Sequence, residues 1–266
     1  MSTPAAGEFP RFSVLDVLLT ACRREQAEDS IVAAARNPSS RAYACVFAVD
    51  SVLKCRDDPN LARIANEADW TLCDGMPLVL IGRRVARRDV SRCYGPDIML
   101  GVLDKGRAAG LRHFFYGGAN DETVRLLREN LERRFPGLTV AGSIVPPFRP
   151  LTEKEKAETA AAIDAARPDV VWVGLGTPKQ DYWTHEMRPL LKVPVIVNVG
   201  AAFNFHAGTV RQAPPWMRRN CLEWLYRLCV EPRRLWRRYL VGNPRFVALV
   251  LRQVLSGRPR RLGAEA

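Results

Sequence analysis

Between residues 42 and 200, short apolar runs alternate with segments in which apolar and polar residues recur at helical spacing. The short runs are rich in β-branched and aromatic residues, which is typical of strands. Several are continuously apolar, as strands covered on both faces of a parallel sheet must be. We therefore predict an α/β fold with parallel strands joined by helices. The expected strands cover residues 42–49, 70–73, 112–116, 138–145, 169–175 and 193–199.

The intervening segments predict helices over residues 13–35, 61–68, 96–109, 121–134 and 152–166, and another after Pro178. Two of these helices have recognisable start signals. Asn120 stands where its side chain can accept a hydrogen bond from a first-turn N–H. Thr152 and Glu155 have the spacing of a capping box. Residues 145–150 form a proline-rich loop.

The chain after Gly208 has a different pattern, with helical periods interrupted at Pro232 and Pro244. We expect three short helices, with large apolar residues standing among arginines. This composition suits an amphipathic surface that enters a lipid interface while arginine meets phosphate. It suits equally a helix pair that docks on the preceding domain and exposes a basic face. We divide the chain into an α/β domain, residues 1–208, and a helical appendage, residues 209–266.

Charge is concentrated in the same region. The 266 residues carry a formal charge of +12, and residues 206–266 hold 13 arginines against three glutamates, which gives +10. Such an excess indicates phosphate-bearing partners, namely nucleic acid, anionic lipid or phosphorylated ligands. No apolar stretch is long enough to cross a bilayer, and the N-terminus lacks a signal-peptide pattern. We expect a cytoplasmic protein.

Metal and nucleophile chemistry has little support in the sequence. The seven cysteines are odd in number and form no CxxC pair, so we expect reduced thiols and neither a disulfide framework nor zinc. His206 has no ligand pattern around it, which favours a structural histidine. Neither a Ser-His-Asp nor a Cys-His arrangement has local support.

Two charged residues, Asp74 and Arg92, stand next to predicted strands and helices and are candidates for the catalytic site. Asp74 directly follows the strand-like segment 70–73 and precedes a helix, which places it at the carboxyl edge of the sheet, where ligands bind in open α/β folds. It can act there as a general base or merely cap the helix. Arg92 offers a planar fork suited to phosphate, and the alternative is a surface arginine beside a capping Asp97.

Two glycine turns also follow strands. Gly174 and Gly176 precede Thr177, Lys179 and Gln180, and backbone donors at such a turn can cradle an anion. A dinucleotide fingerprint is excluded because lysine stands where its third glycine belongs, and a Walker A loop is absent. The turn therefore indicates a phosphate or sugar site. A similar turn lies within residues 198–208.

Six motifs together resemble the WecG/TagA/CpsF family, glycosyltransferase family 26, over residues 40–245. They are DGMPLV at 74–79, RCYGPDIM at 92–99, FFYGG at 114–118, GTPKQDYW at 176–183, GAAFNFHAG at 200–208 and APPWMRRNCLEWLYRLCVEPRRLWRRY at 213–239. Members of that family have a Rossmann-like catalytic domain of the GT-E type. They also have a C-terminal appendage that binds the membrane and helps to close the site.

The resemblance implies transfer, with inversion, of a hexose or N-acetylhexosamine of the glucose or N-acetylmannosamine type. The donor is a UDP-sugar and the acceptor a polyprenyl-diphosphate-linked saccharide in cell-envelope or exopolysaccharide biosynthesis. No metal or other cofactor is implied. The expected partners are these two substrates and an anionic membrane surface, with the protein peripheral on the inner face of the cell membrane. Homo-oligomerisation stays open.

By position, Asp74 matches the family's general base and Gln180 the glutamine that faces the sugar-nucleotide pocket. Arg92 matches a residue near the diphosphate. The further positions implied for UDP-sugar or diphosphate binding are Asp97, Gly117, Gly176, Thr177 and Lys179, with Arg227, Arg234 and Arg237 of the appendage neutralising the leaving UDP. Such a clamp of charges does the work of a divalent cation.

Two departures concern acceptor or sugar contacts. Ala48-Val49-Asp50 stands where many relatives have Thr-x-Asn, and Asn204 replaces an aspartate frequent in the family. These changes favour altered substrate choice, and they keep a second hypothesis open, a non-catalytic membrane-surface scaffold. A third hypothesis, a basic nucleic-acid-binding protein, has only the arginine-rich tail in its favour, since no nucleic-acid-binding module is recognisable.

Overall fold

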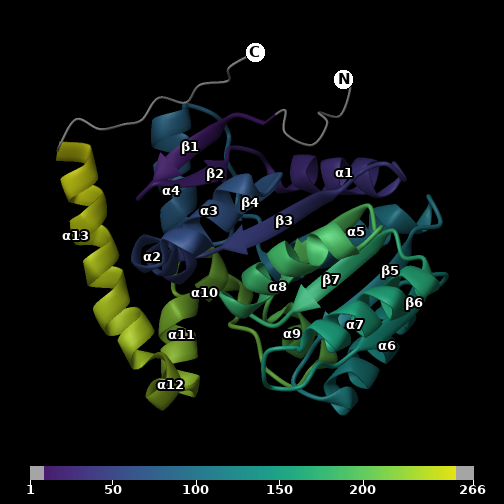
Figure 1. Cartoon of the computed structure of the whole chain (residues 1–266). Coiled ribbons are helices and arrows are strands. Elements are labelled where there is room, and N and C mark those ends of the chain that lie inside the picture. The colour runs from purple at the N-terminus through teal and green to yellow at the C-terminus, as the bar shows by residue number, and fades with distance from the viewer. Residues whose placement is uncertain (1–8, 256–266) are drawn as a thin grey trace.

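The computed structural model describes residues 9–255, and its centre is a six-stranded parallel sheet (Figure 1). The strand order is β4-β3-β8-β7-β5-β6. All six strand predictions are confirmed, with ends shifted by a few residues. The strands are β3 (Ala42–Phe47), β4 (Trp70–Cys73), β5 (Arg112–Gly117), β6 (Thr139–Ile144), β7 (Val170–Gly174) and β8 (Val195–Asn198).

Helices cover both faces of the sheet and enclose two apolar cores. Within β3, Ala42, Ala44 and Val46 belong to one core, whereas Tyr43, Cys45 and Phe47 belong to the other, as the alternation of side chains across a strand requires. The first core lies under α1 (Arg24–Ala35), α5 (Gly95–Arg107), α6 (Asp121–Arg134) and α9 (Ala202–Ala207). The second lies under α2 (Val49–Asp57), α3 (Pro59–Glu67), α4 (Met76–Ala86), α7 (Glu153–Ala166) and α8 (Lys179–Met187).

Both predicted helix caps are confirmed. The Asn120 side chain accepts a hydrogen bond of 2.9 Å from the Thr123 N–H at the start of α6. Thr152 and Glu155 form a complete capping box at the start of α7. These local signals therefore fix the helices that follow β5 and β6.

The helix predicted over residues 13–35 is wrong in its first half. Residues 11–20 form an antiparallel hairpin of β1 (Arg11–Val14) and β2 (Val17–Thr20), and α1 begins at Arg24. Phe12, Val14, Val17 and Leu19 are buried at alternate positions of their strands, which is strand periodicity. Leu15 and Asp16 both have positive φ and make the two-residue turn.

The C-terminal helices are α10 (Pro215–Arg219), α11 (Glu223–Val230), α12 (Pro232–Trp236) and α13 (Gly242–Leu255). The predicted break at Pro232 is confirmed. The predicted break at Pro244 is wrong, because α12 runs into α13 through one π-helical turn, η2 (Arg237–Val241). In this wider turn the Gly242 N–H donates to the Arg237 carbonyl. The turn leaves room for the ring of Pro244 and does not need the N–H that proline lacks, so the helix continues.

The long helix α13 lies along α2 on one side of the molecule (Figure 1). Its Phe246 is buried in the core that α2 covers, and Arg245 forms an ion pair with Asp57 at the end of α2. A docked helix is thus one of the two arrangements left open for the tail. Within residues 9–255, no helix is long and apolar enough to cross a membrane.

Candidate functional site

The predicted site residues converge where the parallel strands end. Asp74 follows β4, the segment 175–177 follows β7, and Gly200 follows β8. The Asp74 N–H donates to the Phe47 carbonyl over 2.8 Å, which extends the pairing of β3 and β4 past their last residues. This is the sheet edge at which open α/β folds bind ligands.

Asp74 is not a helix cap. The N-cap of α4 is Gly75, which makes no side-chain cap, and the Asp74 carboxylate instead faces Arg92. The Arg92 Nη2 atom lies 3.1 Å from Asp74 Oδ1, and its Nε donates to the Asp74 carbonyl over 2.6 Å. Two contacts therefore fix the guanidinium against the end of β4.

A third charged group, which the sequence did not indicate, completes this cluster. Glu223, the first residue of α11, places its Oε2 atom 2.6 Å from Arg92 Nη2. The side chains of Arg92, Asp74 and Glu223 keep 20%, 23% and 14% of their exposure, so all three are largely withdrawn from water while remaining reachable. One guanidinium thus serves two carboxylates from distant parts of the chain.

Burial raises the pKa of Asp74 above its ordinary value. The positive charge of Arg92 opposes this shift, and the negative charge of Glu223 adds to it. Since a carboxylate with a raised pKa holds a proton more tightly, Asp74 is a stronger base than an exposed aspartate.

Two aromatic rings pack against the guanidinium groups at this cluster. The Arg92 guanidinium lies 4.2 Å from the centroid of the Tyr94 ring, and Tyr94 packs against Phe205 at 6.4 Å. Arg227 of α11 lies over Phe205 at 5.9 Å, and its charge acts on Asp74. Of the three appendage arginines that the sequence singled out, Arg227 is therefore the one beside the cluster.

Gln180 ties two glycine turns together. Its side chain is buried, and its Oε1 atom accepts hydrogen bonds of 3.0 Å from the N–H groups of both Gly176 and Gly200. Its Nε2 atom lies 3.4 Å from the Thr177 hydroxyl. The amide thereby holds in place the segments that follow β7 and β8, while the neighbouring Lys179 is exposed.

Asp50 lies at the start of α2 in a chain of charges. Lys54 Nζ lies 2.9 Å from Asp50 Oδ2 and donates to the Thr177 carbonyl over 2.9 Å. Arg238, in η2, approaches Asp50 to 3.6 Å. Asp50 is thus joined to the glycine turn that contains Thr177 and to the C-terminal helices, through two residues that the sequence did not single out.

Gly117 ends β5 in the left-handed region, with φ of 114°. A Cβ atom there would stand 2.8 Å from the Gly174 carbonyl carbon, so any side chain would push β5 and β7 apart. The site glycine is therefore required by this close approach of two backbones.

Four predicted residues lie outside the cluster. Arg234 pairs with Glu231 at 2.7 Å, and Arg237 lies over Trp236 at 5.2 Å, both exposed to solvent. Asp97 lies 3.7 Å from Arg24 and lines a side cavity of about 700 Å³ next to α6 and α9. Asn204 Oδ1 is buried without a hydrogen-bond partner among the described residues.

His206 is placed as a structural residue. Its Nε2 atom lies 3.0 Å from the Pro96 carbonyl, which joins α9 to the start of α5. Burial lowers the pKa of this imidazole below its ordinary value. His206 is therefore predominantly neutral at pH 7 and contributes a hydrogen bond rather than a charge.

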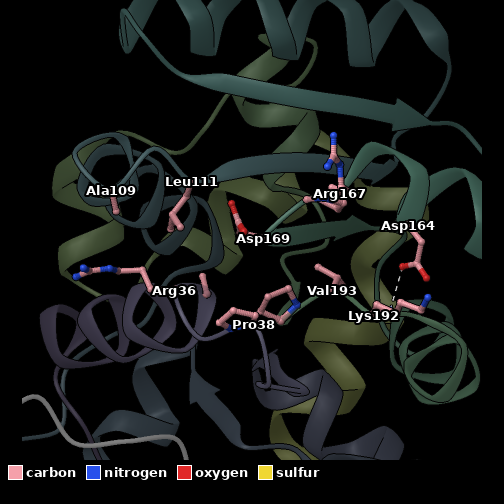
Figure 2. A pocket seen from close by; sticks show the side chains of 12 residues that line it. Arg36, Pro38, Ala109, Leu111, Asp164, Arg167, Asp169, Lys192 and Val193 are labelled. Carbon is pink, nitrogen blue, oxygen red and sulfur yellow. Dashed lines mark hydrogen bonds between the residues drawn. The ribbon is translucent and has the colours of Figure 1, made fainter.

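A second cavity, of about 440 Å³, lies at the opposite edge of the sheet (Figure 2). Its lining residues precede strands, as Asp169 precedes β7, and two of its carboxylates accept hydrogen bonds from the backbone. Asp169 accepts from the Arg112 N–H over 2.7 Å, and Asp164 accepts from the Lys192 N–H over 3.0 Å. This cavity lies across the sheet from Asp74 and gathers none of the predicted site residues.

Among residues 9–255, no three His, Cys, Asp or Glu side chains gather in a way that would hold a metal ion. All seven cysteines are free thiols, five of them buried.

Comparison with known proteins gives two kinds of match. The family model described as the glycosyl transferase WecG/TagA/CpsF family matches residues 12–260. Two curated relatives, both called N-acetylglucosaminyldiphosphoundecaprenol N-acetyl-beta-D-mannosaminyltransferase, come from Bacillus spizizenii strain W23 and Bacillus subtilis strain 168. The first is 34% identical over 207 residues, 77% of each chain, and the second 30% identical over 193 residues, 71% of each chain.

Proposed function

The chain belongs to the WecG/TagA/CpsF glycosyltransferase family, as its motifs predict, and we propose that it transfers a hexose or N-acetylhexosamine from a UDP-sugar to a polyprenyl-diphosphate-linked saccharide. The observation that carries the proposal is the pair of Asp74 and Arg92 at the carboxyl edge of the sheet, where a carboxylate and a guanidinium stand 3.1 Å apart. The names of the relatives make N-acetylmannosamine the first donor sugar to test.

In the proposed reaction Asp74 takes the proton of the acceptor hydroxyl. The hydroxyl oxygen forms a bond to the anomeric carbon, while the bond from that carbon to the diphosphate oxygen breaks and its electron pair leaves with UDP. The raised pKa of Asp74 suits it to this role, and its 23% exposure leaves room for the hydroxyl to approach. Attack from the face opposite the leaving group inverts the anomeric configuration.

In the proposed reaction, arginine side chains stabilise the negative charge of the departing UDP. Arg92 is fixed by two contacts to Asp74, and Arg227 lies over Phe205 beside it. Guanidinium groups held in place before the reaction stabilise the negative charge that develops on the diphosphate. We propose that these two residues stabilise the leaving group as a divalent cation would. Gln180 holds the two glycine turns in position.

The C-terminal helices are proposed to meet an anionic membrane surface, which brings the enzyme to its lipid-linked acceptor. Val247, Leu251 and Val254 recur at helical spacing on α13 and keep 54%, 56% and 66% of their exposure. Exposed apolar side chains among arginines suit the headgroup region of a membrane. We therefore place the protein on the inner face of the cell membrane, in assembly of a cell-envelope polysaccharide.

Vesicle sedimentation tests that placement. The triple variant Val247→Ser, Leu251→Ser, Val254→Ser should lose most of its binding to phosphatidylglycerol vesicles. Leu80→Ser, on α4, is the matched control because Leu80 is equally exposed at 54%. Unchanged sedimentation of the triple variant would remove α13 as the docking surface.

The function itself is tested by UDP release. A panel of UDP-sugars is incubated with a short-chain polyprenyl-diphosphate-linked N-acetylglucosamine in EDTA, with the wild type and Asp74→Asn compared. Acceptor-dependent release by the wild type and its loss in the variant are expected. Asp29→Asn is the control, since Asp29 pairs with Lys105 on the helices α1 and α5, away from the site. Full activity of Asp74→Asn would exclude Asp74 as the base, and binding of no UDP-sugar would contradict the proposal.

A further inference from the structure

Glu223 makes a contact that the proposed reaction does not use. It belongs to α11, 131 residues away from Arg92 along the chain, yet its Oε2 atom is 2.6 Å from Arg92 Nη2. The carboxylate is 14% exposed. A carboxylate withdrawn from water this far needs a compensating partner, and Arg92 supplies it.

Glu223 occupies Arg92 Nη2, one of the two terminal nitrogens with which a guanidinium binds a phosphate. Arg92 Nε is bonded to the Asp74 carbonyl, and Nη2 lies between Asp74 Oδ1 and Glu223 Oε2. Carboxylate and phosphate oxygens present the same kind of acceptor to a guanidinium fork. A diphosphate that reached Nη2 would therefore compete with Glu223 for the same donor.

Charge makes the two occupants mutually exclusive. Asp74 and Glu223 already place two carboxylates around one guanidinium, with Arg227 nearby. A diphosphate arriving beside both would be repelled by like charge at contact distance. Because Asp74 is needed as the base, Glu223 is the group that must leave.

The helix that carries Glu223 is held lightly. None of the eight residues of α11 is buried, whereas α13 buries Phe246. A segment with few buried apolar contacts opens at low free energy. Arg227 stands one turn after Glu223 on the same side of α11, so the departure of Glu223 leaves an arginine as the group of α11 nearest the diphosphate.

We propose that Glu223 is an internal ligand of Arg92 which the diphosphate of the donor replaces, so that donor binding releases the start of α11 from the end of β4. The inference rests on the proposed function, because it takes Arg92 as the diphosphate ligand. It makes Glu223 a residue that sets donor affinity without touching the reacting atoms.

The test measures UDP affinity by calorimetry on the full chain. Glu223→Gln keeps the shape but removes the charge, and it should tighten UDP binding about tenfold, the effect of removing one competing charge at contact distance. Glu129→Gln is the matched control, since Glu129 pairs with Arg125 on α6, away from Arg92, and the affinity of this variant for UDP should equal that of the wild type. In the background of Arg92→Lys the gain from Glu223→Gln should disappear.

Amide hydrogen exchange supplies the second readout. In the wild type, UDP should speed exchange at residues 225–230, whose amides are hydrogen-bonded within α11 and its cap, and Glu223→Gln should show that faster exchange without UDP. If Glu223→Gln proves poorly folded, Glu223→Asp withdraws the carboxylate by one methylene and should give a smaller gain in affinity. Equal or weaker UDP binding by both Glu223 variants would overturn the inference and leave the proposed function intact. Absence of UDP binding by the wild type would overturn both.

Discussion

Two helices of the C-terminal region, α13 and α11, are attached to the sheet domain in different ways. α13 buries Phe246, pairs Arg245 with Asp57, and receives the Leu15 N–H on the side chain of Gln253. α11 buries no residue, and its ionic contact with the sheet domain is Glu223 on Arg92. The two helices therefore differ in role. α13 attaches the C-terminal region to the sheet domain, whereas α11 places the charged side chain of Glu223 against Arg92.

The largest expected effect is at Arg92, where the two regions meet. Arg92→Lys keeps a positive charge but loses the planar fork that contacts the Asp74 carbonyl, its carboxylate and Glu223 together. We expect kcat/KM to fall about 10²-fold, the size found when one pre-organised donor to a developing charge is removed. Steady-state UDP release measures it. A fall of less than about threefold would show that Arg92, where α11 contacts the sheet domain, contributes little to catalysis.

The next largest effect is expected on stability. Phe246→Ala should lower the free energy of unfolding by about 3 kcal/mol, because it empties a buried aromatic site between α13 and the sheet domain. Leu225→Ala on α11 should change it by less than about 0.5 kcal/mol, since Leu225 is exposed. Urea denaturation of both variants gives the two values. Equal losses would abolish the distinction between the helices.

A pH effect of intermediate size belongs to the sheet domain alone. Burial raises the pKa of Asp181 to about 6, and Asn198 donates to its Oδ1 atom over 3.1 Å. The folded protein thus binds this proton more tightly than the unfolded chain, so its stability falls as pH rises from about 4 to about 7 and is level above that. Asp181→Asn removes this titration.

The Asp181→Asn variant should equal the wild type in stability near pH 3.5 and exceed it by about 3 kcal/mol at pH 7.5. Denaturant titrations at the two pH values check this difference. Asp29→Asn, at an exposed pair, should show no such divergence. A difference that does not depend on pH would mean that packing rather than ionisation changes at residue 181.

The smallest effect is expected at the ion pair of Arg245 and Asp57, whose side chains are 45% and 54% exposed. Arg245→Met should lower the free energy of unfolding by at most about 1 kcal/mol, because solvent screens the pair. A double-mutant cycle with Asp57→Asn measures the coupling. A coupling above about 2 kcal/mol would make charge, rather than the burial of Phe246, the main attachment of α13.

The sequence predicts the sheet well because buried parallel strands are locally apolar, and all six lie where apolar runs place them. It predicts Asp74 for a related reason, since a polar residue directly after such a run must stand at the carboxyl edge. The hairpin of residues 11–20 was not predicted because its apolar residues also fit a helical spacing. The feature that distinguishes a hairpin from a helix there is the turn at Leu15 and Asp16.

Contacts between distant segments are what the sequence does not predict. Nothing near Glu223 indicates that it meets Arg92, because the pairing depends on how α11 docks. The same docking separates three arginines that are equivalent by motif: Arg227 stands beside the cluster, whereas Arg234 and Arg237 have local partners in solvent. These are tertiary effects that local spacing does not encode.

The single amide oxygen of Gln180 that receives the N–H groups of Gly176 and Gly200 has a consequence for how such a site diversifies. Two loops that share one acceptor are geometrically a single unit, so an insertion or a shift in either disturbs both. A change that leaves this unit intact is easier at the start of α2, where Asp50 and its neighbours depart from the family's pattern. An engineer who wishes to change the sugar should vary the start of α2 first and leave the glycine turns intact.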